Sequence, residues 1–306
     1  MLIKKKLKII SFAFGFMGEA VVNRLNKSKD INLSGVILPN RNSLYYSDIE
    51  KARYKNTKFL YSDKLNLVHK FIKNIKPDLV IISTFNKIIS KKTLSLAKFI
   101  NIHHGKLPKQ KGRASINWAI LMGRNQIYLT FHEVIPKLDS GKIFLQKKIL
   151  IKKNDYYDSI KLKINTFLDK NIIKILNQYF NKKIKLKINT NSKETWNCSR
   201  NPEDNLINFF EKREKIYNLI RSSDPKRFGA YCYLGSKKII IAEANINSKQ
   251  KFEGIIPGRI VKINKDKSVD CLCKDGVLTI NKIYYKKKLV SPKILISSTR
   301  QTLLND

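Results

Sequence analysis

Asn101 and His103 stand two positions apart in the segment 99–108, which reads Phe-Ile-Asn-Ile-His-His-Gly-Lys-Leu-Pro. If residues 99–103 form a strand, side-chain alternation places Asn101 and His103 on one face and the two isoleucines beside them on the other. An amide donor next to an imidazole can polarise a carbonyl group and move a proton. Such a pair taken alone more often caps a loop or satisfies a backbone group, so a catalytic interpretation requires a further partner.

Asp139 is the candidate partner. It lies in the turn Lys-Leu-Asp-Ser-Gly-Lys at 137–142, which follows an expected strand at 128–134. Asp beside Ser-Gly is ordinary turn chemistry when it stands alone. Together with Asn101 and His103, however, it completes a set that could stabilise an oxyanion and take a proton from an attacking amine. The set contains no nucleophile, so direct acyl transfer between two substrates fits it better than a covalent enzyme intermediate.

The elements that must position these residues alternate between strand and helix patterns. Apolar strand-like runs occur at 7–14, 33–38 and 78–83, and helical patterns at 64–75, 91–98, 116–122 and 155–180. Wholly apolar strands that alternate with helices predict a parallel sheet covered on both faces. Ligands of such sheets bind at the carboxyl ends of the strands, where Asn101 and His103 would emerge.

The last third of the chain has a different pattern. Residues 181–205 are polar and irregular, and beyond them short strand-like runs are separated by glycine and Pro-Gly turns. This pattern favours a small antiparallel barrel. We therefore expect a catalytic domain over 1–185, a linker over 186–205 and a barrel-like domain over 206–306.

Charge dominates the composition. Lys and Arg number 62 against 23 Asp and Glu, a formal net charge of +39. Such a charge attracts polyanions, whether tRNA, an anionic membrane surface or a phosphorylated metabolite. The lysines are spread over every segment, however, and accompany abundant Ile and Asn, as AT-rich coding DNA would produce. We favour this compositional origin over a dedicated nucleic-acid surface.

Other classes are disfavoured. Apolar residues make up 42% of the chain with no uninterrupted apolar run of about 18 residues, which argues against a disordered or membrane-inserted protein. No signal-peptide pattern precedes Gly15, so we expect a cytoplasmic protein. Four cysteines are too few for a disulfide framework, and no metal site is expected. Gly15 and Gly18 form half of a dinucleotide fingerprint, but no acidic residue ends the second strand, which disfavours an NAD site.

The motifs, in their order and spacing, resemble the 10-formyltetrahydrofolate-dependent formyltransferase family. They are Asn101-Ile102-His103, Leu107-Pro108, Lys111-Gly112-Arg113-Ala114, Leu129-Thr130-Phe131-His132, Leu138-Asp139-Ser140-Gly141, Phe228-Gly229-Ala230-Tyr231, Pro257-Gly258 and Asp275-Gly276. The resemblance implies an α/β fold, with a Rossmann-like formyltransferase domain built on a mostly parallel sheet and a small C-terminal β-barrel-like (OB-like) domain. It also implies an enzyme that transfers a formyl group from 10-formyltetrahydrofolate, the formyl-donor substrate, to a primary amine without a metal.

The resemblance implies a role for individual residues. Asn101, His103 and Asp139 would be catalytic: Asn101 and His103 donate to the oxygen that gains charge, and Asp139 orients His103. The residues expected to bind the folate are Phe85, Asn86, Lys87, Ile88, Leu107 and Pro108. The residues expected to bind the acceptor are Phe14, Gly15, Met17, Arg113 and Asn117.

The acceptor divides the family. The opening at 12–18, Phe-Ala-Phe-Gly-Phe-Met-Gly, is similar to that of the domain that formylates UDP-4-amino-4-deoxy-L-arabinose. The segments 112–118 and 200–207 are also similar to it, although Ser115 replaces a usual proline. The basic insertion typical of initiator-tRNA formyltransferases is missing. We expect an amino-sugar nucleotide as acceptor, with initiator methionyl-tRNA as the alternative.

Two other interpretations of the protein's function stay open. A basic nucleic-acid-binding protein without catalysis would rest on the +39 charge and the barrel, which could bind single strands or tRNA. A hydrolase that deformylates the folate would use the same chemistry. His104 stands where the family commonly has a small residue, and it could either perturb His103 or line the loop. No oligomeric state is predicted.

Overall fold

The computed structural model describes residues 6–43, 49, 54–189 and 193–304. The chain divides into two compact units. Unit 1 comprises 1–115, 126–150 and 159–197, and unit 2 comprises 116–125, 151–158 and 198–306. Two short segments from the first half of the chain thus group with the C-terminal part, a feature that sequence order does not indicate. The division at 185 and 206 expected above stays a prediction.

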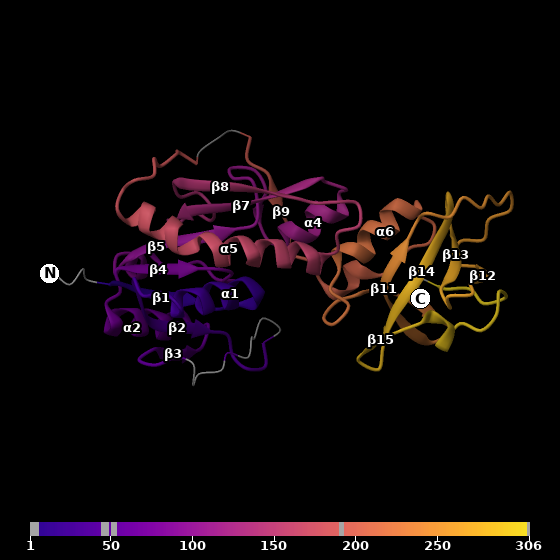
Figure 1. Cartoon of the computed structure of the whole chain (residues 1–306), viewed down its shortest axis with the longest axis horizontal. Helices are drawn as coiled ribbons and strands as arrows, with labels where there is room; N and C mark the ends of the chain where they lie inside the picture. The colour runs from indigo at the N-terminus through magenta and orange to yellow at the C-terminus, as the bar shows by residue number, and fades with distance from the viewer. Residues whose placement is uncertain (1–5, 44–48, 50–53, 190–192, 305–306) are drawn as a thin grey trace. The chain divides into compact units, whose positions relative to one another are not determined.

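Unit 1 is built on a seven-stranded sheet with the strand order β3-β2-β1-β4-β5-β7-β8 (Figure 1). The strands are β1 (Leu7–Phe12), β2 (Ile31–Leu38), β3 (Lys58–Tyr61), β4 (Leu79–Ile82), β5 (Lys98–His103), β7 (Gln126–Glu133) and β8 (Ile143–Leu150). The strands from β3 to β5 pair in parallel, whereas β7 and β8 pair antiparallel. The predicted mostly parallel sheet is confirmed.

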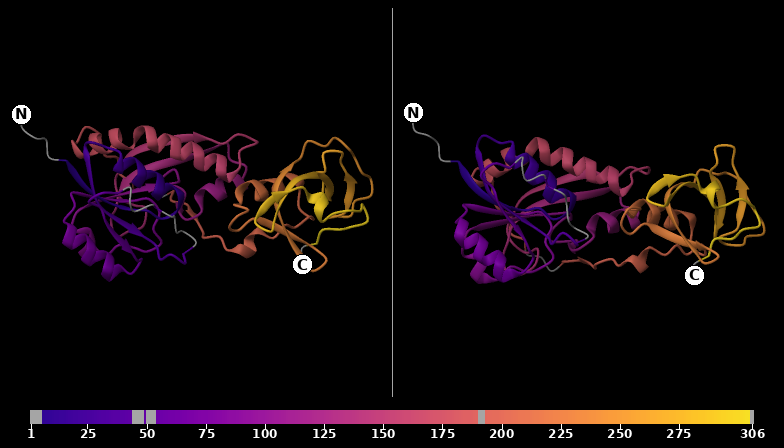
Figure 2. Two further views of the ribbon diagram at one scale, coloured as in Figure 1. Left: turned by 60° about the horizontal axis from the view of Figure 1, so that its bottom comes forward. Right: turned by 90° about the horizontal axis from the view of Figure 1, so that it is seen from below.

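Helices cover both faces of this sheet. They are α1 (Gly15–Asn26), α2 (Leu65–Ile75), α3 (Lys91–Leu94) and α5 (Tyr157–Phe180), the last of which begins in unit 2. Figure 2 shows α2 and α5 on opposite sides of the strands. Val68 and Ile72 of α2 pack with Ile10, Ile37 and Phe99 from alternate positions of the strands. The helix predicted at 91–98 is wrong in its second half, because the chain leaves α3 after Leu94 to enter β5 at Lys98.

Unit 2 contains a separate antiparallel sheet with the order β10-β11-β14-β13-β12, to which β15 adds beside β14. Its strands are β10 (Ala230–Leu234), β11 (Lys237–Asn245), β12 (Ile260–Ile263), β13 (Val269–Cys273), β14 (Gly276–Tyr285) and β15 (Lys288–Val290). The unit also holds α6 (Arg213–Ser222), most of α4 (Ser115–Leu121), η2 (Pro202–Asn205) and η3 (Pro292–Ile294). This separate antiparallel sheet confirms the expected antiparallel β-sheet domain in the C-terminal part of the chain.

The C-terminal segment closes this sheet. Tyr233 of β10 and Leu304 exchange two backbone hydrogen bonds, while the Ile260 amide of β12 donates to the Gln301 carbonyl oxygen. Gly258, at φ +85°, lies where a Cβ would come within 2.0 Å of the Leu303 carbonyl oxygen. A glycine is therefore required for the segment to approach. The core beneath includes the buried thiols of Cys232, Cys271 and Cys273.

Within the described part of the chain, every helix is too short or too polar to span a bilayer. The longest, α5, is amphipathic instead: Ile160, Ile164, Leu168 and Ile172 recur on its buried face. That spacing is the helical period which the sequence shows.

The α5 face gives a stability prediction. Leu168 is fully buried, whereas Leu162 on the same helix is 68% exposed. We expect Leu168→Ala to lower the free energy of unfolding by about 2–5 kcal/mol through lost burial and a cavity, and Leu162→Ala to change it by less than about 0.5 kcal/mol. Urea unfolding followed by circular dichroism measures both, and equal effects of the two substitutions would contradict this packing.

Candidate functional site

Three of the predicted residues come together at the carboxyl end of β5. The pairing of β5 with β7 sets Asn101 opposite His132 and His103 opposite Thr130. The Asn101 Nδ2 atom lies 3.1 Å from His132 Nε2 and donates to Asp139 Oδ1 at 3.5 Å. Asn101, His103 and Asp139 thus belong to one contiguous cluster, which also contains His132.

The Asp139 carboxylate lies at the centre of the cluster. Its Oδ2 accepts a hydrogen bond from the Gly112 backbone N–H at 3.0 Å and lies 3.6 Å from His103 Nδ1. Its Oδ1 lies 3.6 Å from His132 Nε2. Asp139 is only 7% exposed, and a buried carboxylate requires such partners because its charge is otherwise poorly solvated.

The ring of His103 is oriented from both sides. Its Nε2 lies 2.7 Å from the Gln110 carbonyl oxygen, which can only accept, so Nε2 carries a proton. Nδ1 therefore faces Asp139 either as a lone pair or, in the imidazolium, as a second N–H donor. The ring thus has an acceptor oxygen on each side, the Gln110 carbonyl and the Asp139 carboxylate.

His132 has the complementary arrangement. Its Nδ1 donates to the Glu133 carbonyl oxygen at 2.7 Å, which leaves the Nε2 lone pair to accept from Asn101. Burial lowers the pKa of His132 to about 4, although the negative charge of Asp139 opposes this shift. The ring is therefore neutral near pH 7 and holds the Asn101 amide with its nitrogen toward the carboxylate.

The turn that carries Asp139 is tightly constrained. Asp139 adopts φ +47°, and a Cβ at Gly141 would lie 1.8 Å from the Glu133 carbonyl oxygen. The Asn189 Nδ2 atom donates to the Asp139 carbonyl oxygen at 2.8 Å and to the Gly141 carbonyl oxygen at 3.0 Å. The turn is thus fixed both by the lack of space around it and by a side chain from the segment after α5.

The residues expected to bind the folate lie on several segments of unit 1. The Phe85 ring packs edge-on against Phe12 and Phe14, with centroid distances of 4.8 and 5.2 Å. Lys87 forms a 3.0 Å ion pair with Asp63.

The other residues expected to bind the folate differ in exposure. Ile88 is 59% exposed, whereas Leu107 is buried and joined to Pro108 by a cis peptide bond. The Asn86 carbonyl oxygen accepts from Arg113 Nη2 at 2.6 Å. Their binding role stays a prediction.

The residues expected to bind the acceptor belong to both units, and their binding role stays a prediction. Phe14, Gly15 and Met17 are buried where α1 begins, and Arg113 contacts Asn86 as described. Asn117 belongs to unit 2, where its Nδ2 donates to the Ser222 carbonyl oxygen at 2.7 Å. The structure thus brings Arg113 to the segment predicted to bind the folate, and it commits the Asn117 amide to a backbone contact.

His104 lies away from the cluster despite its sequence position. Its ring stacks on Phe16 of α1, with centroids 5.8 Å apart, and its Nε2 is buried without a hydrogen bond. Burial, assisted by the neighbouring His103, lowers the pKa of His104 to about 3. His104 is the first residue after β5 ends at His103, and its ring lies against α1.

Sequence reasoning missed several residues that hold the cluster. His132 was noted only within a motif, and its proximity to Asn101 depends on an antiparallel pairing that no pattern reveals. Lys111, the Gly112 amide and Asn189 act through contacts over long sequence separations. The one usable signal was the placement of His132 on an apolar strand, where a polar side chain needs a partner.

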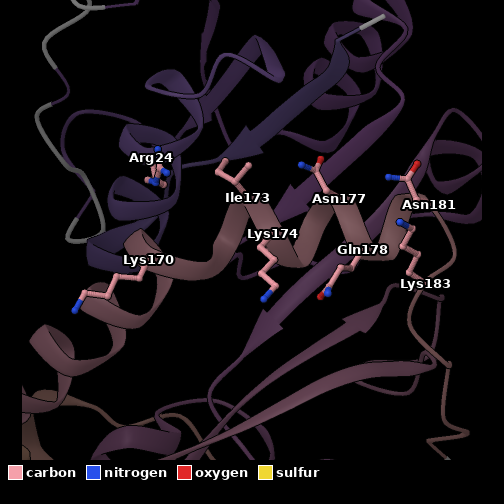
Figure 3. A pocket seen from close by; sticks show the side chains of 8 residues that line it. All are labelled: Arg24, Lys170, Ile173, Lys174, Asn177, Gln178, Asn181 and Lys183. Carbon is pink, nitrogen blue, oxygen red and sulfur yellow. The ribbon is translucent and has the colours of Figure 1, made fainter. Parts of the chain in front are cut away.

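A surface cavity of about 440 Å³ lies elsewhere in unit 1. It is lined by Arg24, Lys170, Ile173, Lys174, Asn177, Gln178, Asn181 and Lys183. Figure 3 shows Lys170 and Lys174 projecting from the same side of α5. No residue of the Asp139 cluster contributes to it. Among the described residues, no three His, Cys, Asp or Glu side chains gather closely enough to hold a metal ion.

Comparison with known proteins assigns both parts of the chain. The family model for formyl transferase matches residues 22–176, and the model for the formyl transferase C-terminal domain matches 200–299. A methionyl-tRNA formyltransferase of Kosmotoga olearia is 30% identical over 221 residues, which cover 72% of this chain and 70% of that protein. The bifunctional polymyxin resistance protein ArnA of Wigglesworthia glossinidia brevipalpis is 28% identical over 87% of this chain, but the match covers only 42% of ArnA.

A solved structure supports the fold. The N-formyltransferase of Helicobacter canadensis, crystallised with folinic acid and dTDP-3-aminofucose, superposes with a TM-score of 0.66. The superposition covers 91% of this chain and 100% of that one at 18% identity. At this identity the likeness concerns the fold alone.

The buried histidines predict how stability depends on pH. The pKa of His132 falls from 6.5 to about 4 on folding, so the unfolded chain gains a proton first as the pH drops. The free energy of unfolding should decrease below pH 6.5, by about 2 kcal/mol for His132 alone at pH 5. His132→Gln and His104→Gln should each flatten the slope between pH 6.5 and 5. Chemical denaturation across this range measures the slope, and a slope unchanged in both variants would refute it.

Proposed function

As a member of the formyltransferase family, this chain is an N-formyltransferase that takes its formyl group from 10-formyltetrahydrofolate, and we propose that Asn101, His103 and Asp139 carry out the transfer. The observation that carries the proposal is the buried Asp139 carboxylate in contact with both partners, 3.5 Å from Asn101 Nδ2 and 3.6 Å from His103 Nδ1. An amide donor, an imidazole and a carboxylate are the groups that acyl transfer to an amine requires.

The proposed reaction begins when a neutral acceptor amine attacks the formyl carbon. Negative charge develops on the formyl oxygen, and Asn101 donates to it. Both N–H groups of the Asn101 amide are directed to protein acceptors, and the 3.5 Å contact with Asp139 is the longer one. The substrate oxygen replaces that weaker acceptor, while His132 keeps the other N–H in place.

The proton of the attacking amine passes to the pair formed by His103 and Asp139. A proton at His103 Nδ1 gives an imidazolium whose two N–H groups face Asp139 and the Gln110 carbonyl oxygen. The bond between the formyl carbon and N10 of the folate then breaks, and the proton held by the His103–Asp139 pair passes to N10, which returns both side chains to their starting state. The products are the N-formylated acceptor and tetrahydrofolate, so atoms and charge balance.

We propose an amino-sugar nucleotide as the acceptor. The start of α1 supports this proposal: Gly15 adopts φ +65°, and no atom lies within 4 Å of the position that a Cβ would take there, so a phosphate could approach its backbone. The ArnA relative is 28% identical over 87% of this chain. A nucleotide diphosphate needs only a few cationic or backbone donors.

Initiator methionyl-tRNA is the second candidate. The Kosmotoga olearia relative carries that activity in its name, and the +39 charge of this chain would bind an RNA backbone by counterion release. The cations are diffuse, however, and no basic insertion follows the second strand. These two features favour the small nucleotide sugar.

Alanine substitutions test the assignment of the three residues. We expect His103→Ala and Asp139→Ala to lower kcat at least about 10²-fold, because each removes a group that handles the proton. Asn101→Ala should cost about 2.7–4 kcal/mol of transition-state stabilisation as a lost oxyanion donor. Steady-state kinetics with 10-formyltetrahydrofolate measure these effects.

His104→Ala is the matched control, since His104 is adjacent in sequence but stacks on Phe16. We expect it to lower kcat by less than about fivefold. Equal damage from His103→Ala and His104→Ala would reverse the assignment of the two histidines.

A panel of acceptors tests the substrate class. We expect turnover of UDP-4-amino-4-deoxy-L-arabinose or dTDP-3-aminofucose, with little change between 50 and 200 mM salt. Binding of methionyl-tRNA should weaken by about 10³-fold or more over that range if several phosphate contacts carry it. Efficient formylation of methionyl-tRNA at 200 mM salt, with no turnover of either sugar nucleotide, would identify the second candidate as the acceptor.

A further inference from the structure

Lys111 is a fully buried cation beside the Asp139 turn. Its side chain is 0% exposed, and lysine is almost never buried to this extent unless it is paired. The Nζ atom donates to Glu194 Oε1 at 2.7 Å and to Ser140 Oγ at 2.7 Å. It also lies 5.4 Å from the centroid of the Trp196 ring, within the range of a cation–π contact.

The contact with Ser140 reaches the turn that carries Asp139. Ser140 Oγ accepts from Lys111 and donates its own proton to the Leu138 carbonyl oxygen at 2.9 Å. Lys111 therefore holds the Ser140 hydroxyl in place. This hydroxyl links residues 138 and 140, which lie on either side of Asp139. The position φ +47° at Asp139 needs such support, because a non-glycine residue adopts it only at a cost.

The backbone around Lys111 serves the same carboxylate. The Lys111 N–H donates to the Thr195 carbonyl oxygen at 2.9 Å, and β6 (Lys111–Gly112) pairs with β9 (Trp196–Asn197). The next amide, that of Gly112, is the one that donates to Asp139 Oδ2. Lys111 thus contacts Ser140 of the turn through its side chain, and the next residue, Gly112, contacts the Asp139 carboxylate through its backbone amide.

Stability alone gives little reason for this ion pair. Burial of an ammonium group costs desolvation free energy, and a carboxylate whose side chain is 21% exposed offsets only part of it, so the contact of Lys111 with Ser140 points to a positional role. The charge is also felt within the cluster, since Lys111 is one of the groups that lower the pKa of His132. Lys137, in contrast, is 67% exposed and lies 3.8 Å from the same Glu194 carboxylate.

We propose that Lys111 is a positioning residue for formyl transfer, which acts through Ser140 to hold the Asp139 carboxylate against His103, with Glu194 as its counter-ion. The inference rests on the proposed role of Asp139. It assigns no contact between Lys111 and either substrate, so its loss should affect kcat more than KM.

The test compares Lys111→Met, Ser140→Ala and the control Lys137→Met. We expect the first two to lower kcat roughly tenfold to hundredfold, with KM for 10-formyltetrahydrofolate changed less than about threefold, because small displacements of a catalytic group carry costs of this size. Lys137→Met should stay within about twofold of the parent protein. Lys111→Arg, which keeps the charge and several donors, should recover most of kcat. The acceptors are UDP-4-amino-4-deoxy-L-arabinose and initiator methionyl-tRNA in parallel.

A spectroscopic measurement separates this proposal from the proposed function. The chain has four histidines, so ring nitrogen shifts in NMR spectra can be assigned by substitution. Lys111→Met and Ser140→Ala should shift the His103 and His132 signals, whereas Lys137→Met should not. This result is expected whichever acceptor is used, and it needs no turnover.

Several results would overturn the proposal. Lys111→Met and Ser140→Ala with full kcat, while Asp139→Asn is inactive, would leave the proposed function standing and remove the role of Lys111. An active Asp139→Asn variant would instead refute the role of Asp139. If Lys111→Met fails to fold, two other variants test the role of Lys111. They are the double variant Lys111→Met with Glu194→Gln and the single variant Ser140→Ala. Unshifted histidine signals in a folded Ser140→Ala variant would also refute it.

Discussion

The burial of the Asp139 carboxylate is the constraint on which the site depends. A charge that is 7% exposed must find its donors within the protein, because water no longer supplies them. Its neighbours come from three places in the sequence: β5 with Asn101 and His103, β7 with His132, and the Gly112 amide of β6. The sheet order β4-β5-β7, the tight turn at Gly141 and the segment after α5 all serve to bring these groups to one carboxylate.

The two histidines that contact the carboxylate differ in character because their second ring nitrogens differ in surroundings. His132 donates to its neighbouring carbonyl and is held neutral by burial, so it acts as an acceptor toward Asn101. His103 has an acceptor on each side, the Gln110 carbonyl oxygen and the Asp139 carboxylate. Two chemically identical side chains thus differ in their hydrogen bonding, and the backbone carbonyl that each ring contacts sets which of its nitrogens carries the proton.

Structure that depends on patterns repeating over a few residues could be predicted from the sequence. The apolar runs predicted the parallel strands, the helical period predicted α5, and strand alternation predicted that Asn101 and His103 share a face. Contacts between residues far apart in the sequence could not be predicted. The pairing of β5 with β7 is antiparallel and brings His132 to Asn101, and Asn189 reaches back 50 residues to the Asp139 turn. The grouping of residues 116–125 with unit 2 has the same origin, since it depends on tertiary contacts that leave no local periodicity.

The closure of the unit 2 sheet by residues 301–304 also determines how that unit meets other chains. Backbone hydrogen bonds from this segment occupy the outer sides of both β10 and β12. These two strands are therefore covered against β-pairing with another chain. Repulsion between like charges also opposes such pairing, but salt screens it. The covering is made by main-chain atoms, so it tolerates variation in the side chains of the covering segment but not in Gly258, where the approach leaves no room for a Cβ. The covering of β10 and β12 by backbone hydrogen bonds does not depend on ionic strength, unlike the repulsion between lysine side chains.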